Sequence, residues 1–114
     1  MKKEIAVISL GGSLIIPDNI DYSFLEKFKK VMRKNYKTHK FVVVCGGGSI
    51  ARKYISILKK QKKSVEEQSL SGIRATRMNA RFMMQFFGKK ANSILPKNMK
   101  EVKSNLSTIT IFKY

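Results

Sequence analysis

Residues 42–55 read VVVCGGGSIARKYI, an apolar run that leads into three glycines and then into a helical pattern. The run Phe41–Cys45 is short and rich in β-branched residues, which is typical of a strand buried on both faces of a parallel sheet. Ser49 is expected to open the helix that follows. The predicted apolar face of that helix comprises Ile50, Tyr54, Ile57 and Leu58.

The same order of features occurs earlier in the chain. Glu4–Leu10 (EIAVISL) is nearly continuous in hydrophobicity, so we expect a strand covered on both faces, and it leads into Gly11-Gly12-Ser13. A helix follows, with Ser23 and Glu26 spaced as a capping box. Two such units predict an α/β fold with parallel strands and right-handed crossovers, in which both glycine loops face a crevice at one sheet edge.

The second half of the chain is predicted to contain a further helix and a further strand. Ser64 and Glu67 are spaced to cap another helix, which is expected to run until Gly88 ends it. Thr108–Phe112 (TITIF) predicts a third buried strand. A length of 114 residues limits the chain to a single domain, residues 1–114.

Composition narrows the function classes. No apolar run approaches the roughly 20 residues of a membrane span, and no signal-peptide core follows Lys2, so we expect a cytoplasmic protein. The formal charge of +17 attracts phosphate-bearing partners, although no base-reading motif is recognisable. Cys45 is expected to pack in the core, and His39 to be a loop residue without partners.

The glycine loops point to phosphate chemistry. A strand that stops at glycines and restarts as a helix leaves backbone N–H groups for an anion. Arg52, one turn into the helix, could fold back onto that anion, whereas Lys53 is expected to point elsewhere. With no carboxylate pair, metal-ligand cluster or nucleophile–base set, the sequence supports neither a hydrolase nor a metalloenzyme.

Two other phosphate-binding classes fit less well. The P-loop pattern G-x-x-x-x-G-K-[ST] does not occur. Gly46-x-Gly48-x-x-Ala51 fits the dinucleotide fingerprint, but the acids about 20 residues further on, Glu66 and Glu67, do not follow an apolar strand as that fingerprint requires.

Three stretches resemble the archaeal-type uridylate kinases of the amino-acid-kinase family: ISLGGSLIIPD (Ile8–Asp18), VVVCGGGSIARKYI (Val42–Ile55) and GIRATRMNA (Gly72–Ala80). The resemblance implies a three-layer αβα sandwich with a mainly parallel sheet, of which this chain would be the N-terminal, phosphate- and acceptor-binding portion. It also implies transfer of the ATP γ-phosphoryl group to UMP, Mg²⁺ as the bridging ion, and assembly as a homo-oligomer, usually a hexamer.

The resemblance also assigns roles to individual residues. Gly12 and Ser13 would lie along the phosphates of ATP, and Gly47 at the UMP phosphate. Gly48 with Arg52 would stand beside the transferring group. The T-R-x-N element would place Arg77 and Asn79 in support of the acceptor side.

The sequence departs from the family pattern in three respects. Ser69 stands where the family has an aspartate that holds the ribose, and it could bind UMP only as a neutral acceptor. Ser9 stands two residues before the first glycine pair, where many members of the family carry a lysine that reaches the transferring phosphate. The family continues well past this length, and its remainder is expected to hold the base and ribose of ATP.

Two alternatives stay open at this point. The chain could be a non-catalytic phosphate- or nucleotide-binding module, possibly RNA-associated through its charge. Another member of the family, such as an isopentenyl phosphate kinase or an acetylglutamate kinase, is disfavoured by the A-R-K-Y element at Ala51–Tyr54.

Overall fold

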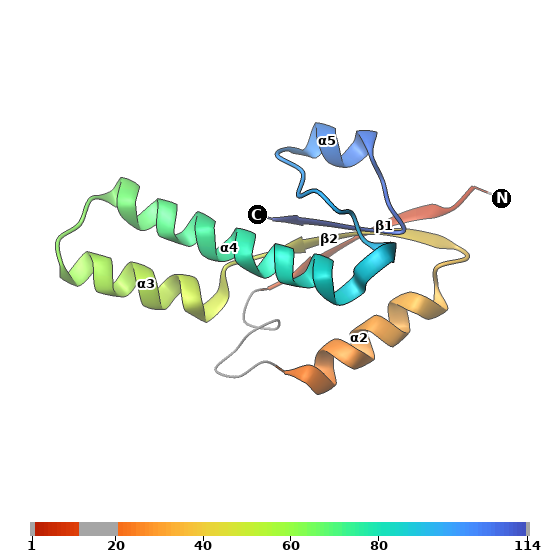
Figure 1. Ribbon diagram of the computed structural model, residues 1–114, viewed down its shortest axis with the longest axis horizontal. Helices are drawn as coiled ribbons and strands as arrows, with labels where there is room; N and C mark the ends of the chain where they lie inside the picture. The colour runs from red at the N-terminus through yellow and green to blue at the C-terminus, as the bar shows by residue number, and fades with distance from the viewer. Residues whose placement is uncertain (1, 12–20, 114) are drawn as a thin grey trace.

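The computed structural model describes residues 2–11 and 21–113, and its centre is one parallel sheet in the order β1-β2-β3 (Figure 1). The strands are β1 (Glu4–Leu10), β2 (His39–Cys45) and β3 (Ile109–Lys113). The helices are α2 (Tyr22–Lys34), α3 (Gly48–Lys60), α4 (Val65–Phe87), the 3₁₀ helix η1 (Gly88–Lys90) and α5 (Met99–Ser104). The predicted α/β fold with a parallel sheet is confirmed.

The strand register brings the ends of β1 and β2 together. Glu4 lies opposite His39 and Leu10 lies opposite Cys45, so the two strands start and finish level with each other. On the other side of β2, Phe41 pairs with Ile109. The carboxyl ends of β1 and β2 therefore form one edge, as predicted.

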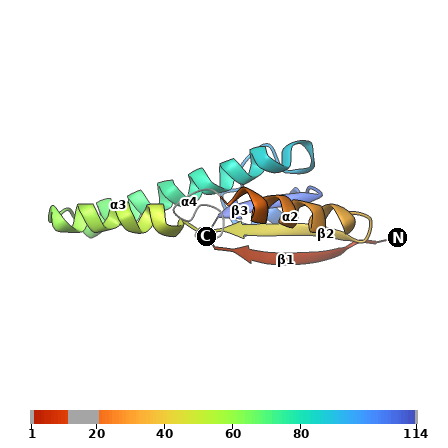
Figure 2. The ribbon, with the colours of Figure 1, turned by 90° about the horizontal axis from the view of Figure 1, so that it is seen from below.

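The main core lies between the sheet and the helices α2 and α4. Figure 2 shows these helices on the same side of β1, and the rings of Phe28 in α2 and Phe87 in α4 meet edge to face with centroids 6.0 Å apart. The buried members of this core are Leu10, Leu25, Met32, Phe41, Val43, Cys45, Ala80, Met83, Phe87, Ile109 and Ile111. Alternate residues of each strand supply it, because successive side chains of a strand point to opposite faces.

The two neighbouring strands differ in how they are covered. β2 is buried on both faces, as predicted, since Val42 and Val43 are both inaccessible. The prediction that Glu4–Leu10 is covered on both faces is wrong for the described residues, since Ile5 and Val7 remain 56% and 65% exposed. β1 is an edge strand, and α2 and α4 pack only against the face that carries Leu10.

Helix α4 begins and ends as the sequence predicts. The Ser64 hydroxyl accepts a hydrogen bond from the Glu67 amide at 3.1 Å, which satisfies one of the open donors of the first turn. Gly88 terminates the helix with φ of 67°, a left-handed conformation that favours glycine.

Helix α2 begins differently from the prediction. Its cap is Asp21, whose carboxylate accepts from the Phe24 amide at 3.0 Å, so the predicted capping box of Ser23 and Glu26 is wrong. An aspartate and a serine are equally good caps, and the sequence placed both within three residues of each other.

Helices α3 and α4 form a hairpin that extends beyond the ends of the strands (Figure 1). α3 starts at Gly48 and not at Ser49. Tyr54 and Ile57, predicted on a buried face, are 56% and 58% exposed, because the described sheet does not reach under this part of the hairpin. Ala51 is instead the buried residue of α3.

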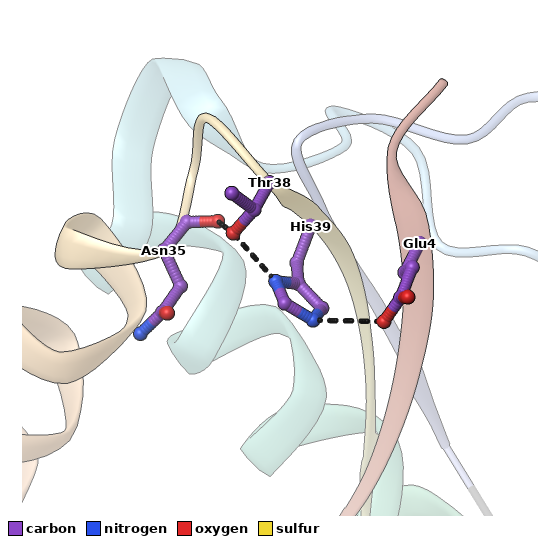
Figure 3. A network of polar contacts seen from close by, with 4 residues as sticks. All are labelled: Glu4, Asn35, Thr38 and His39. Carbon is purple, nitrogen blue, oxygen red and sulfur yellow. Dashed lines mark hydrogen bonds and ion pairs between the residues drawn. The ribbon is translucent and has the colours of Figure 1, made fainter. Parts of the chain in front are cut away.

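His39 is a strand residue and not a loop residue, contrary to the prediction. It opens β2 beside the first residue of β1, with Nε2 3.4 Å from the Glu4 carboxylate and Nδ1 2.7 Å from the Thr38 hydroxyl (Figure 3). This polar cluster lies at the amino end of the two strands, far from their glycine loops.

Candidate phosphate-binding site

The candidate site lies where β1 and β2 end. The amide of Gly46 donates to the carbonyl of Leu10 at 3.4 Å, which continues the pairing of the strands by one step. The chain then turns into α3 through Gly47 and Gly48. Gly12 and Ser13, predicted to lie along ATP phosphates, fall outside the described residues.

The glycine triplet forms the start of α3. Gly47 is the N-cap residue and, being glycine, has no side chain with which to cap the first amides of the helix. Gly48 has φ of 64°, in the left-handed region that glycine adopts without strain. A helix N-terminus without a capping side chain presents backbone N–H donors and a partial positive charge to an anion.

Gly47 is also required by the packing of α3 against α4. A Cβ atom at this position would lie 2.7 Å from the Cβ of Ala51 and 3.0 Å from the hydroxyl of Thr76. Both distances are too short for ordinary contacts: the contact with Ala51 would distort the first turn of α3, and the contact with Thr76 would displace α4. The close approach of α4 thus depends on this glycine.

The side chain of Asn79, in α4, binds the glycine loop through hydrogen bonds. Its side chain is only 2% exposed, and its amide nitrogen donates to the carbonyls of Gly46 and Gly47 at 2.9 and 3.2 Å. Buried amides with this geometry rigidify the segment they bind. The sequence singled out Asn79 through its motif, but nothing in the spacing identified these two carbonyls as its partners.

Arg77 belongs to a different face of α4. Arg77 is exposed. Residues two positions apart in an α-helix differ by about 200° around its axis, so Arg77 and Asn79 point in nearly opposite directions. The structure therefore does not bring Arg77 to the glycine loop with Asn79, and its support of the acceptor side stays a prediction.

Ser69 lies further out on α4. It precedes Thr76 by seven residues, so the two share one side of the helix at a separation of about 10 Å along the axis. Thr76 adjoins Gly47, which places Ser69 about two turns beyond the glycine triplet on the same side. Ser69 is exposed to solvent.

Arg52 lies on α3 one turn after Gly48 and is exposed. It lines a shallow hollow of about 530 Å³. Lys53, which was expected to point elsewhere, lines the same hollow, so two cations border it. The residues around the hollow are Ser49, Arg52, Lys53, Ser56 and Ile57.

Cys45 is a packing residue, as predicted. It is fully buried immediately before the glycine triplet, and its burial raises the pKa of the thiol to about 12. A thiol with so high a pKa is not a nucleophile at neutral pH.

Residues 2–11 and 21–113 contain no cluster of metal-ligating side chains. These residues contain no group of three or more His, Cys, Asp or Glu side chains that could hold a metal ion. The part of the chain that the structure describes also contains no helix long and apolar enough to cross a bilayer.

The parallel sheet, the uncapped helix start and the braced glycine loop define an α/β protein with a glycine loop at the sheet edge whose geometry suits an anion. The model of the amino acid kinase family matches residues 4–111. The chain belongs to this family.

Proteins named uridylate kinase are similar in sequence to most of this chain. It is 41% identical over 106 residues to the uridylate kinase of Thermoplasma volcanium, an alignment that covers 91% of this chain and 45% of that protein. It is 35% identical over 85 residues to the uridylate kinase of Thermococcus onnurineus, covering 75% of this chain and 38% of that protein.

The fold is similar to that of a solved structure. The uridylate kinase of Archaeoglobus fulgidus superposes with a TM-score of 0.79 at 26% identity, over 96% of this chain and 50% of that chain. This chain therefore spans about half the length of the relatives it matches.

Proposed function

We propose that this chain binds UMP at the glycine edge and belongs to an enzyme that transfers the γ-phosphoryl group of ATP to UMP, giving UDP. The observation that carries the proposal is the buried amide of Asn79, which holds the carbonyls of Gly46 and Gly47 at the start of α3. A loop braced in this way offers fixed backbone donors to a phosphate. The likeness to uridylate kinases supports UMP as the acceptor.

Each residue of the edge has a proposed role. The Gly47 amide would bind the phosphate of UMP, and Gly48 with Arg52 would stand beside the transferring group. The guanidinium of Arg52 suits this role because it can donate two parallel hydrogen bonds to phosphate oxygens. Gly12 and Ser13 would lie along the phosphates of ATP.

The acceptor nucleoside would extend along α4. Ser69 lies on the same side of α4 as Thr76, two turns further from the glycine triplet, where its hydroxyl could bond a ribose hydroxyl of UMP. Asn79 would act by positioning the loop, and Arg77 would support the acceptor side from the outer face of α4.

The proposed reaction needs no protein base. A phosphate oxygen of UMP attacks the γ-phosphorus of ATP while the bond to the ADP oxygen breaks, and positioning with charge neutralisation supplies the catalysis. Mg²⁺ accompanies ATP in such reactions and neutralises phosphate charge. The described residues contain no cluster of three or more ligating side chains for the ion, so we assign it no step.

We also propose that the chain is cytoplasmic and associates with further copies of itself. The α3–α4 hairpin exposes apolar side chains that a second copy of the chain would cover, in line with the hexamer expected from the family. They are Tyr54, Ile57, Leu70, Ile73 and Met78. Sedimentation of the chain as a monomer at all concentrations would contradict the proposed assembly.

Thermal unfolding with and without nucleotide tests the proposal. A ligand at about 100 times its Kd stabilises the native state by about 2.7 kcal/mol, which raises the Tm of a domain this size by on the order of 10 °C. We expect this shift with UMP, and a much smaller one with CMP or AMP. Formation of UDP from UMP and ATP tests transfer separately.

The matched variants are Arg52→Ala and Arg74→Ala, because both arginines are exposed on the helices of the hairpin. UMP should no longer raise the Tm of Arg52→Ala, whereas it should still raise the Tm of Arg74→Ala. An equal shift in both variants would remove Arg52 from the site. Equal shifts for UMP, CMP and AMP would leave a phosphate site without the proposed acceptor.

A further inference from the structure

The amino end of the sheet carries a second feature, which the proposed function does not use. There α2 packs against the last turn of α4: the ammonium of Lys29 donates to the Phe86 carbonyl at 3.1 Å and lies 4.9 Å from the centre of the Phe86 ring. The turn after α2 and the helix η1 after α4 are therefore neighbours (Figure 1).

Exposed cations run along α2 to this end of the molecule (Figure 2). On α2, Lys27, Lys30 and Lys34 follow one another at helical spacing on the side opposite the buried Leu25 and Met32. We name the whole set the basic tract. Its members, all exposed, are Lys27, Lys30, Arg33, Lys34, Lys37, Lys89 and Lys90.

The basic tract is continuous between its two helices. The Lys90 ammonium of η1 lies 6.0 Å from the centre of the Tyr36 ring, just after α2. The Tyr36 amide in turn donates to the Arg33 carbonyl at 3.4 Å, so Arg33, Tyr36 and Lys90 lie at one junction. The cations of η1 thus extend the row that begins on α2.

Acids are few near the basic tract in the described chain, and Glu26, next to Lys27, is the nearest in sequence. The sequence between Lys27 and Lys40 contains neither Asp nor Glu. Among the described residues the salt bridge found joins Glu4 and His39, and none involves a member of the tract. The chain therefore keeps a concentrated positive field at this end, in a protein of net charge +17.

We propose that the basic tract binds nucleic acid through its phosphate backbone, without reading its sequence. From Lys27 to Lys34 the helix rises about 10 Å, a length over which one strand of duplex DNA presents about three phosphates. The cations of the tract stand on exposed side chains without a rigid base-reading surface beside them, so affinity comes from charge on the phosphates.

A membrane surface fits the basic tract less well. Amphipathic helices that bind bilayers insert an apolar face into them. The apolar face of α2 is already used inside the protein, where Leu25 and Met32 are almost completely inaccessible. Phosphates that approach the tract from solvent meet only the lysine side of the helix.

The basic tract is separate from the glycine edge. Its Lys34, Lys37, Lys89 and Lys90 lie toward the end of β2 that begins with His39, whereas the glycine triplet follows Cys45, and Lys27 stands about 10 Å along α2 from Lys34. The seven residues of β2 separate the two ends by about 20 Å. Nucleic acid and UMP should therefore bind without competing.

The test is fluorescence anisotropy of a labelled oligo(dA) strand with the whole chain over a series of salt concentrations. The variant K27Q/K30Q/K34Q removes three cations from the tract. Its matched control, K59Q/K60Q/K63Q, removes three exposed lysines at and just after the end of α3. We expect the slope of log K against log salt to fall by about 2 to 3 for the first variant, since each lost phosphate contact contributes about 0.7 to 0.9.

Three further measurements complete the test. The variant K27R/K30R/K34R should restore binding, and K89Q/K90Q should lower the slope by about 1 to 2 if the first variant fails to fold. UMP at saturating concentration should leave oligo(dA) bound. Vesicles of phosphatidylserine and phosphatidylcholine should bind less than the oligonucleotide does at equal salt.

Several results would overturn the proposal. Equal weakening by the α2 and α3 variants would mean that net charge alone binds the strand. Displacement of oligo(dA) by UMP would locate it at the glycine edge, and preferential binding of vesicles would make the partner a lipid surface. Undetectable binding at about 0.1 M salt would remove nucleic acid as a partner.

Discussion

The two ends of the sheet would meet phosphate in different ways. At the carboxyl end, the proposed donors are backbone amides of Gly47 and Gly48, and the loop is held by the buried Asn79. At the amino end, the cations of the basic tract stand on long, exposed side chains. A rigid loop can distinguish one phosphate ester from another, whereas flexible lysines respond mainly to charge and salt.

Substitution of Gly47 should have the largest effect on the carboxyl end. Gly47→Ala places a Cβ 2.7 Å from that of Ala51 in the first turn of α3 and 3.0 Å from the Thr76 hydroxyl of α4, so we expect a loss of about 2–4 kcal/mol in unfolding free energy as the helix start distorts and α4 shifts. Denaturant unfolding measures it. Gly11→Ala is the matched control, because a Cβ there meets nothing within 4 Å. Similar losses for the two variants would contradict the packing role of Gly47.

Removal of the Asn79 amide should be the next largest change. Asn79→Ala leaves two carbonyls without their buried donor, and we expect a loss of about 1–3 kcal/mol together with weaker binding of UMP. The control is Asn35→Ala, since the Asn35 amide donates to the Val31 carbonyl on an exposed turn at 2.8 Å. If Asn79→Ala binds UMP as well as the unaltered chain, Asn79 does not position the loop.

The carboxyl end should also respond to alkaline pH. Burial raises the pKa of Cys45 to about 12, so above about pH 9 the thiol ionises in the unfolded chain but not in the folded one. Stability conferred by the neutral thiol is complete below that pH and falls by about 1.4 kcal/mol per unit above it. Unfolding of Cys45→Ala at pH 7 and pH 10 should lack this component. An unchanged pH dependence would mean that the thiolate is accommodated in the core.

The amino end should show the smallest effect on stability. K27Q/K30Q/K34Q replaces exposed side chains on the outer face of α2, so the unfolding free energy should change by less than about 0.5 kcal/mol. Urea unfolding at low and high salt would measure this. A loss above 1.5 kcal/mol would show that these lysines support the fold, and the contrast between the two ends would then be weaker.

Local sequence determined much of the architecture by itself. The bounds of β1 agree with the prediction, because a β-branched run bounded by glycine strongly favours a strand. The ends of α4 agree as well, because Ser64 and Gly88 act on the amides and dihedral angles of their own neighbours. The glycine triplet likewise predicted a helix start with open amides.

Only the tertiary structure decided which surfaces are covered and which residues meet. The apolar patterns of Ile5 and Tyr54 were correctly recognised, yet both side chains are exposed, because burial depends on neighbouring elements. The bonds from Asn79 join positions more than 30 residues apart, a pairing that no local spacing encodes. Periodicity thus specified the elements, while packing decided that Asn79 reaches the glycine loop and Arg77 does not.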